Sequence, residues 1–301
     1  MAVKTARAQI AGNWYTLTYN AGNGRWEATI NAPNTTSYNQ PDHYYACVVE
    51  ATNDAGTTGT ATASELEGLR LRVLEKIAPT ISITSPGNGA YTHNAQQAIE
   101  FTITDEIGGS GVDLDSIRLV IDDSEPVTQS GMICTPDGTS YRCIYTPSSP
   151  LGDGSHTVAI NASDHDGNAA TQASVTYTVD TVPPELNVSE PSDGITVAQD
   201  TLTVRGTTSD ITSTPVVIKI AVGGVDQGAV TVEPSGQFAH SITLAEGSNV
   251  IKVTATDASG QQSTVTINVT LDTSVPKITS ATITPNPVDA GATMIISVVI
   301  E

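Results

Sequence analysis

Short runs of alternating apolar and polar residues recur along the chain and predict β-strands. Ile99, Phe101 and Ile103 alternate with polar neighbours, and the same alternation returns near residues 117, 158, 218, 251 and 265. A period of two places these side chains on one face of a strand, whereas a helix requires a period near 3.6. Half-buried strands separated by frequent turns are typical of two-sheet sandwiches.

A short phrase closes three of these strands: Ala, then Ser or Thr, then Asp or Asn, two variable residues and Gly. Its copies begin at Ala51, Ala162 and Ala255. A second phrase begins at Leu151 and Leu244 and ends in Gly-Ser followed by His or Asn. Both phrases lie 93 positions apart in the last two copies, so they belong to one repeating unit of domain size.

The repeats and the prolines between them predict an all-β chain of tandem β-sandwiches in an elongated rod. The expected domains are an atypical sandwich at residues 1–77, two sandwiches at 78–182 and 183–273, and a partial domain or strand-donating hairpin at 274–301. Prolines at the junctions stiffen the linkers, because proline fixes φ and cannot extend the interior of a sheet.

The last segment contains only two strand-like runs, which is too few to close a sandwich. An isolated two-stranded hairpin is marginally stable, and its unpaired edges are adhesive. Three explanations compete: a truncated piece, a hairpin docked on the third sandwich, or strands donated to a partner subunit. We expect docking or donation, with the register set by the side chains Ile278, Ile283, Ile296 and Val298.

Composition narrows the possible partners. The chain has 12 basic and 32 acidic side chains, and its net charge of -20 repels nucleic acid and anionic membrane surfaces. We expect no membrane insertion, because no run approaches the roughly 20 apolar residues needed to cross a bilayer. The first ten residues are not typical of a secretion signal, so we expect either assembly inside a cell or a piece of a longer protein.

Three cysteines are too few for a disulfide scaffold. Cys47 lies on an alternating apolar face and is expected to be a buried thiol. Cys134 and Cys143 flank a Pro-Asp-Gly turn, where a cross-strand disulfide is geometrically possible. In a reducing cytosol the two thiols would stay free, so both alternatives stand.

The two phrases, together with the stretch from Asp105 to Asp113 and the Val-Asp-Thr-Val-Pro-Pro junction at 179–184, resemble bacterial immunoglobulin-like repeats. Such repeats occur in surface adhesins and in bacteriophage tail proteins. The resemblance covers residues 79–276 well and the first unit more loosely, and the chain is most similar to tail-associated proteins of Firmicutes phages. It implies tandem immunoglobulin-like sandwiches, but it is weak for function because such modules serve as spacers, binders and assembly parts.

No catalytic motif is present, so we do not expect an enzyme. Calcium is the one cofactor that the sequence suggests, because Asp164, Asp166 and Asn168 place alternate oxygens on a tight turn. Asp105, Glu106 and Asp180 are further candidates at the junctions between domains. The alternative is an ordinary Asx turn before glycine, and the third copy favours it, because Asp257 is not followed by a second carboxylate.

Aromatic side chains are concentrated in the first 45 residues. Successive pairs such as Trp14 and Tyr15 must point to opposite faces of a strand, so that one member fills the core and the other stays on the surface. Exposed aromatics are enriched at docking surfaces. The candidate binding residues are Trp14, Tyr15, Tyr19, Tyr38 and Tyr44.

These features together predict a structural protein that assembles with other subunits of a phage tail or a phage-like particle and contacts the host surface. Its expected location is the virion, assembled in the bacterial cytoplasm. The alternative is a fragment of a bacterial cell-surface adhesin that binds a glycan or a protein through its repeats.

Overall fold

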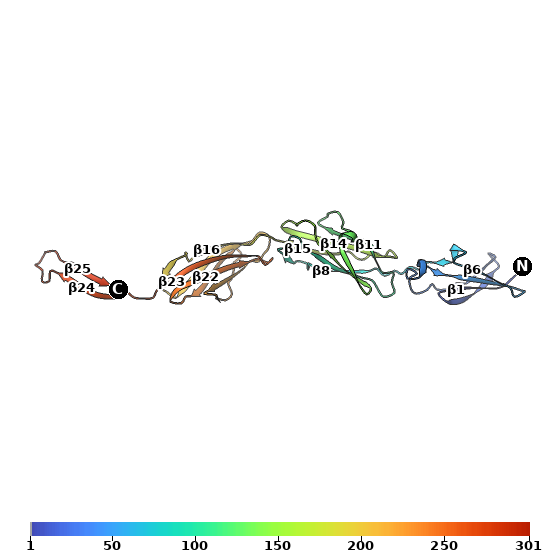
Figure 1. The fold of residues 1–301 in the computed structure, drawn as a ribbon, viewed down its shortest axis with the longest axis horizontal. Helices are drawn as coiled ribbons and strands as arrows, with labels where there is room; N and C mark the ends of the chain where they lie inside the picture. Colours follow the sequence, from blue (N-terminus) through green and yellow to red (C-terminus); the bar gives the residue numbers. More distant parts are fainter. Residues whose placement is uncertain (1) are drawn as a thin grey trace. The chain divides into compact units, whose positions relative to one another are not determined.

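The computed structural model describes residues 2–301, and strands with short connections make up its regular structure (Figure 1). The helical segments of the described residues are three short 3-10 turns: η1 (Pro41–His43), η2 (Glu67–Leu69) and η3 (Gln129–Gly131). None of them is long and apolar enough to cross a membrane. The chain divides into two compact units, Met1–Val179 and Asp180–Glu301, which are described separately below.

Residues 2–77 of the first unit form one five-stranded sheet in the order β3-β2-β1-β5-β6 and one two-stranded pair, β4-β7. The strands are β1 (Val3–Ile10), β2 (Asn13–Asn20), β3 (Arg25–Glu27), β4 (Tyr45–Ala46), β5 (Val48–Asn53), β6 (Thr58–Thr62) and β7 (Arg70–Leu71). Strand β3 ends at Glu27, and Cys47 lies between β4 and β5.

A sandwich of two four-stranded sheets completes the first unit, and we call it the middle sandwich. The sheet orders are β12-β13-β10-β8 and β11-β14-β15-β9. Figure 1 shows β8 on one side of this sandwich and β11, β14 and β15 on the other. The strands are β8 (Thr80–Ser85), β9 (Tyr91–Thr92), β10 (Ile99–Thr104), β11 (Val112–Ile121), β12 (Ile133–Asp137), β13 (Ser140–Tyr145), β14 (Gly154–Asp164) and β15 (Ala173–Val179).

The alternating residues of the sequence form the core of the middle sandwich. Phe101 and Ile103 from one sheet pack in the same fully buried cluster as Val158 and Ile160 from the other. Cys134 and Cys143 lie directly opposite each other on β12 and β13 and form a disulfide, which decides between the two alternatives left open by the sequence.

The second unit contains a sandwich built on the same plan, which we call the second-unit sandwich. Its sheets have the orders β16-β18-β21 and β17-β23-β22-β19-β20. The strands are β16 (Glu185–Glu190), β17 (Ile195–Val197), β18 (Thr201–Ser209), β19 (Val217–Val222), β20 (Val225–Asp226), β21 (Gln237–Thr243), β22 (Gly247–Thr256) and β23 (Gln262–Leu271). Val204 of one sheet and Ile251 and Val253 of the other are fully buried in its core.

The last segment is a two-stranded antiparallel sheet of β24 (Ile278–Thr284) and β25 (Ile295–Ile300). Every residue from Asp272 to Glu301 is exposed. Two strands alone have no second layer against which they can bury side chains.

The repeated phrase forms the same turn in all three copies. The N–H of Gly56, Gly167 and Gly260 donates to the carbonyl of the Asn or Asp three residues earlier. That Asn or Asp side chain also accepts the backbone N–H four residues later, at 2.8 to 3.0 Å. The three glycines have φ between +81° and +90°, a region that L residues with a side chain rarely adopt. The turn therefore requires both the Asx side chain and the glycine.

Candidate cation sites at the ends of the sandwiches

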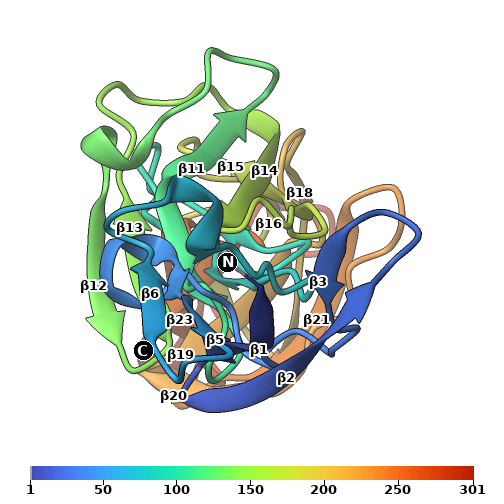
Figure 2. The same cartoon turned by 90° about the vertical axis from the view of Figure 1, so that its right-hand side faces the viewer.

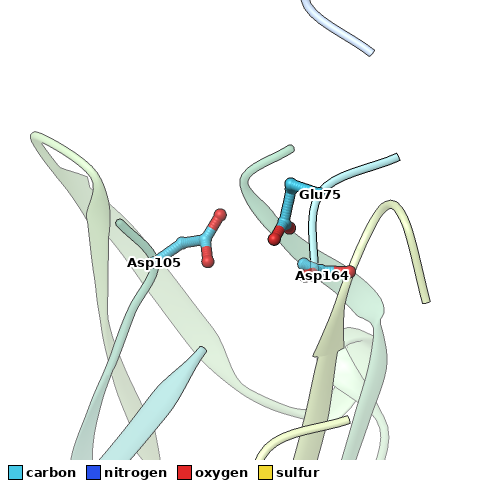
Figure 3. Close-up of side chains that lie close together, drawn as sticks. All are labelled: Glu75, Asp105 and Asp164. Atoms are coloured by element: carbon cyan, nitrogen blue, oxygen red, sulfur yellow. The ribbon is translucent and has the colours of Figure 1, made fainter. Parts of the chain in front are cut away.

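One end of the middle sandwich gathers three carboxylates from separate segments (Figure 3). Asp105 follows the last residue of β10, Asp164 ends β14, and Glu75 lies in the linker before β8. Carboxylate oxygens of the three residues lie within 4.8 Å of one another. Their side chains point toward a common point between the elements that carry them (Figure 3).

The second unit repeats this arrangement with residues at equivalent places. Asp210 follows β18, Asp257 follows β22, and Asp180 lies in the segment before β16. One oxygen from each residue again lies within 4.8 Å of the others. Asp164 and Asp257 are the equivalent acids of the repeated turn, so the cluster belongs to the repeat.

Both clusters contain deeply buried carboxylates. Asp105 and Asp164 are 3% and 1% exposed, and Asp180 and Asp257 are 0% and 6% exposed. None of the five ion pairs among the described residues involves a member of either cluster. Burying an ionised carboxylate without a compensating positive charge is costly. Two such groupings in one chain therefore require a counter-charge or a proton.

Each cluster also keeps one buried carboxylate oxygen without a hydrogen-bond partner. In the first cluster it is Oδ1 of Asp105, whose Oδ2 accepts the N–H of Gly111 at 2.7 Å. In the second it is Oδ2 of Asp257, whose Oδ1 accepts the Ser259 hydroxyl and the Gln261 N–H. Buried polar atoms without a partner are rare, and a place for a bound ion is one of the recognised reasons.

The carboxyl groups of the first cluster have shifted pKa values, because they are buried and lie close to one another. Burial, a hydrogen bond with Asp164 and the charges of Asp164 and Glu106 raise the pKa of Glu75 to about 7. Burial and the neighbouring Glu106 raise the pKa of Asp105 to about 6. Burial acts to raise the pKa of Asp164 as well, but hydrogen bonds from Glu75 and Asn168 lower it by more. Without a cation, the cluster retains a proton near neutral pH.

The donor atoms fit a hard cation. Both clusters offer carboxylate oxygens and neither contains histidine or cysteine, a set that suits calcium rather than zinc. The residues would hold calcium through carboxylates from three separate segments. Bound calcium would supply the missing positive charge.

The three predicted ligands, Asp164, Asp166 and Asn168, make different contacts in the structure. Asp164 belongs to the first cluster. Oδ2 of Asp166 instead accepts the Thr36 hydroxyl at 2.6 Å and the Glu75 N–H at 3.0 Å. Asn168 donates its side-chain amide to Asp164 at 2.8 Å and to the Glu75 carbonyl at 3.2 Å. The last two residues thus hold the linker in place beside the cluster.

Glu75 and Asp210 were not among the residues that the sequence suggested, because both lie far along the chain from the repeated turn. The lack of a second carboxylate after Asp257 argued against an ion in that copy. In the structure, Asp180 and Asp210 bring two further carboxylates to Asp257 from separate segments. The expected Asx turn and the acidic cluster coexist.

The five aromatic candidates do not form one surface. Trp14 is 40% exposed and lies under the guanidinium of Arg7, at 4.1 Å, on one face of the five-stranded sheet. Tyr15 and Tyr19 lie on the other face, because they alternate with Trp14 along β2. Tyr38 stacks on the rings of His43 and His165, and Tyr44 lies beside Arg70.

One surface hollow lacks convergent catalytic groups. It has a volume of about 670 Å³ and lies on the second-unit sandwich, where Glu185 is the one titratable side chain in its lining. A catalytic site requires convergent acid, base or nucleophilic groups. The lining offers hydroxyl, amide and backbone groups instead.

Comparison with known proteins agrees with this architecture. Residues 102–181 match the family described as "Bacterial Ig-like domain". Residues 102–181 are therefore similar to a bacterial immunoglobulin-like domain, and the fold is that of tandem immunoglobulin-like sandwiches. Residues 184–273 match the family described as "Glucodextranase, domain B". A segment of 128 residues is 32% identical to Bacillopeptidase F of Bacillus subtilis (strain 168), covering 42% of this chain and 8% of that protein.

Solved structures of tandem β-domains are also similar. The fibronectin(III)-like modules of Clostridium thermocellum CbhA match 64% of this chain and 94% of their own, with 16% identity and a TM-score of 0.42. A three-immunoglobulin-domain fragment of titin matches 90% of this chain and 88% of its own, with 11% identity and a TM-score of 0.40. A tetra-tandem repeat from the extending region of a large adhesion protein matches 98% and 79%, with 18% identity and a TM-score of 0.34.

Proposed function

We propose that this chain is a non-enzymatic structural module of a bacterial surface protein, in which calcium holds the linker segments against the immunoglobulin-like repeats. The observation that carries the proposal is the equivalent placement of the two acidic clusters, each with a buried carboxylate oxygen that lacks a partner. In a chain of small domains, one domain fixes the position of the next only if the linker between them is stiff. Calcium bound between linker and domain would supply that stiffness.

In the first unit, the linker is already attached to the sandwich at several atoms. The backbone N–H and carbonyl of Glu75 bond Asp166 and Asn168, and its side chain accepts the Ser110 hydroxyl at 3.3 Å. In the second unit, Asp180 accepts the Ser213 hydroxyl, and its carbonyl accepts the Gln261 amide at 3.2 Å. A cation shared by three segments would strengthen these contacts.

A location outside the cytoplasm is supported by the disulfide between Cys134 and Cys143, because such bonds persist in oxidising compartments. This favours the adhesin-type role over assembly in a bacterial cytoplasm. A role in a phage tail is a second proposal, supported by the exposed hairpin, whose edges are free to pair with another subunit. Antibodies against the purified chain, applied to cell-wall and particle fractions of the source culture, distinguish the two locations.

Calcium titration of the full chain by isothermal calorimetry at pH 7.5 tests the proposal. We expect two ions per chain for the unaltered protein and one ion for Asp105→Asn or Asp257→Asn. The matched control is Asp54→Asn, which alters the first copy of the turn, where the structure shows no such cluster among the described residues. Calcium should also slow proteolysis of the linkers near residues 74–79 and 180–184. No calorimetric binding at millimolar calcium, or two ions retained by both variants, would refute it.

A further inference from the structure

A fourth carboxylate lies beside the first cluster. Glu106 directly follows Asp105 in the turn after β10. Its atom Oε2 is buried and has no hydrogen-bond partner, and the same is true of Oδ1 of Asp105, a residue that is 3% exposed. Buried polar atoms normally have a partner. Two such oxygens on adjacent carboxylates indicate a place for a positively charged ligand at this turn.

Gly109 leaves the space that these two carboxylates occupy. A Cβ at Gly109 would lie 2.6 Å from Oε1 of Glu106 and 2.7 Å from Oδ2 of Asp105. Gly109 is not among the glycines with positive φ, so its backbone does not itself require glycine. The two carboxylates therefore converge on one position, and their presence is what excludes a side chain there.

Glu106 acts electrostatically on two members of the first cluster. Burial is the main cause of the raised pKa values of Asp105 and Glu75, and Glu106 contributes to both shifts. Carboxylates that raise one another's pKa lie close enough to attract the same cation. Salt also screens charges around a buried site only weakly. Glu106 thus adds a fourth negative charge at the first cluster.

No counterpart of Glu106 accompanies the second cluster among the described residues. The residue after Asp210 is Ile211, which is fully exposed. Oδ1 of Asp210 accepts the N–H groups of Thr212 and Ser213 at 2.8 and 2.7 Å, and the buried Ser213 hydroxyl donates to Asp180. The second cluster therefore has three carboxylates and neutral neighbours in this turn, whereas the first has four carboxylates.

We propose that Glu106 makes the first cluster the tighter of two calcium sites, so that the chain fills them in a fixed order as the calcium concentration rises. The inference rests on the proposed function, because both clusters must hold calcium. Calcium affinity depends on the number of charged ligands around the ion. In this order, calcium holds the linker before β8 at concentrations at which it does not yet hold the segment before β16.

Calcium calorimetry on full-length variants that keep one cluster each tests the inference. Asp257→Asn keeps the first cluster, and Asp105→Asn keeps the second. At about pH 8, above the pKa of Glu75, which is about 7, protons compete little with calcium. We expect the Asp257→Asn chain to bind calcium at least about tenfold more tightly than the Asp105→Asn chain, because its site has more carboxylates.

Glu106→Gln, added to each of these two chains, isolates the effect of the fourth carboxylate. The substitution keeps the shape of the side chain and removes its charge. In the Asp257→Asn chain, we expect it to weaken calcium binding at least about tenfold. In the Asp105→Asn chain, it should leave the affinity unchanged, because the second cluster is built from other segments.

Glu125→Gln is the matched control. Glu125 is exposed and follows β11, whose first residue, Val112, pairs with Asp164 of the first cluster. Figure 2 shows β11 and β14 side by side. Because β11 is 10 residues long, Glu125 lies beyond the end of the strand that is remote from the cluster. This variant should leave both calcium affinities unchanged.

The outcomes separate the inference from the proposed function. Two ions of equal affinity, or an effect of Glu106→Gln no larger than that of Glu125→Gln, would overturn the inference and leave calcium binding itself intact. If the unaltered chain bound no calcium at all, the proposed function would be refuted and the inference with it.

Discussion

The imidazole ring of His165 stacks on the phenol ring of Tyr38, with centroids 4.3 Å apart and planes inclined by 8°. The contact joins the repeated turn of the middle sandwich to the segment of residues 2–77 within the first unit. His43 stacks on the same tyrosine ring, also at 4.3 Å. Tyr38 is one of the candidate binding residues, and in the structure its half-buried ring lies in this contact between two parts of the chain.

Removal of this contact should lower the free energy of unfolding of the first unit. Aromatic pairs contribute about 0.5–1.5 kcal/mol beyond the area they bury, so a Tyr38→Ala and His165→Ala double-mutant cycle should give a coupling free energy in that range. The measurement is thermal unfolding of the two single variants and the double variant. Strictly additive effects would show that the stacked rings do not stabilise each other.

The acidic cluster at Glu75 should make the stability of the first unit depend on pH in chelator. Since the folded-state pKa of Glu75 is raised from 4.5 to about 7, its protonated form stabilises the fold below pH 4.5, and this contribution is lost as pH rises through 7. The melting temperature measured in chelator should therefore fall over that window. Added calcium should restore the melting temperature at pH 7 and should have little effect on it at pH 5.

Glu75→Gln is the matched variant for that experiment, because it keeps the shape of the side chain and removes the titrating group. We expect its melting temperature in chelator to vary less between pH 4.5 and 7. An unchanged pH profile would show that Glu75 does not carry the proton.

The pKa of the half-buried His156 should lie above that of an ordinary histidine. Its Nδ1 lies 2.5 Å from Oδ2 of Asp122, and its Nε2 lies 2.7 Å from the carbonyl of Gly152, so both ring nitrogens face acceptors. Burial lowers the pKa of His156, but the hydrogen bonds and the charge of Asp122 raise it by more, to a value above 6.5. Its contribution to stability is complete below pH 6.5 and is lost as pH rises through the raised pKa.

An NMR titration of the His156 ring protons measures that pKa directly. Asp122→Asn should shift the midpoint downward, because it removes the negative charge and keeps a similar shape. A midpoint at or below the ordinary value of about 6.5 in the unaltered chain would contradict the prediction.

Gly206 should tolerate no side chain. A Cβ at this position of β18 would lie 2.3 Å from the carbonyl oxygen of Asn187 and 2.5 Å from Cζ of Phe238. Overpacking of a core typically costs 1–3 kcal/mol, so we expect Gly206→Ala to lower the unfolding free energy of the second unit by about that amount. Gly59→Ala, where a Cβ meets nothing within 4 Å, should change the first unit by about 0.5 kcal/mol or less. Chemical denaturation with tryptophan and far-ultraviolet probes measures both variants.

Periodicity was sufficient to predict the β-strands of the sandwich cores, because a period of two leaves a clear pattern in residues such as Phe101 and Ile251. The glycine turn after Asp164 was equally clear. The complete acidic clusters could not be predicted from the sequence, because tertiary folding brings Glu75 and Asp210 to the turn. The ends of strands leave no such pattern, because the pairing partner decides them: the pairing of β3 with β2 ends at Glu27.

Each acidic cluster takes two carboxylates from a sandwich and the third from the segment that leads into it. The site is therefore a property of one repeat together with its own leader, and it can be copied as a single genetic block. Duplication of such a block would lengthen the protein and add one candidate cation site at the same time. The number of calcium ions that such a protein could bind would then rise with the number of its repeats.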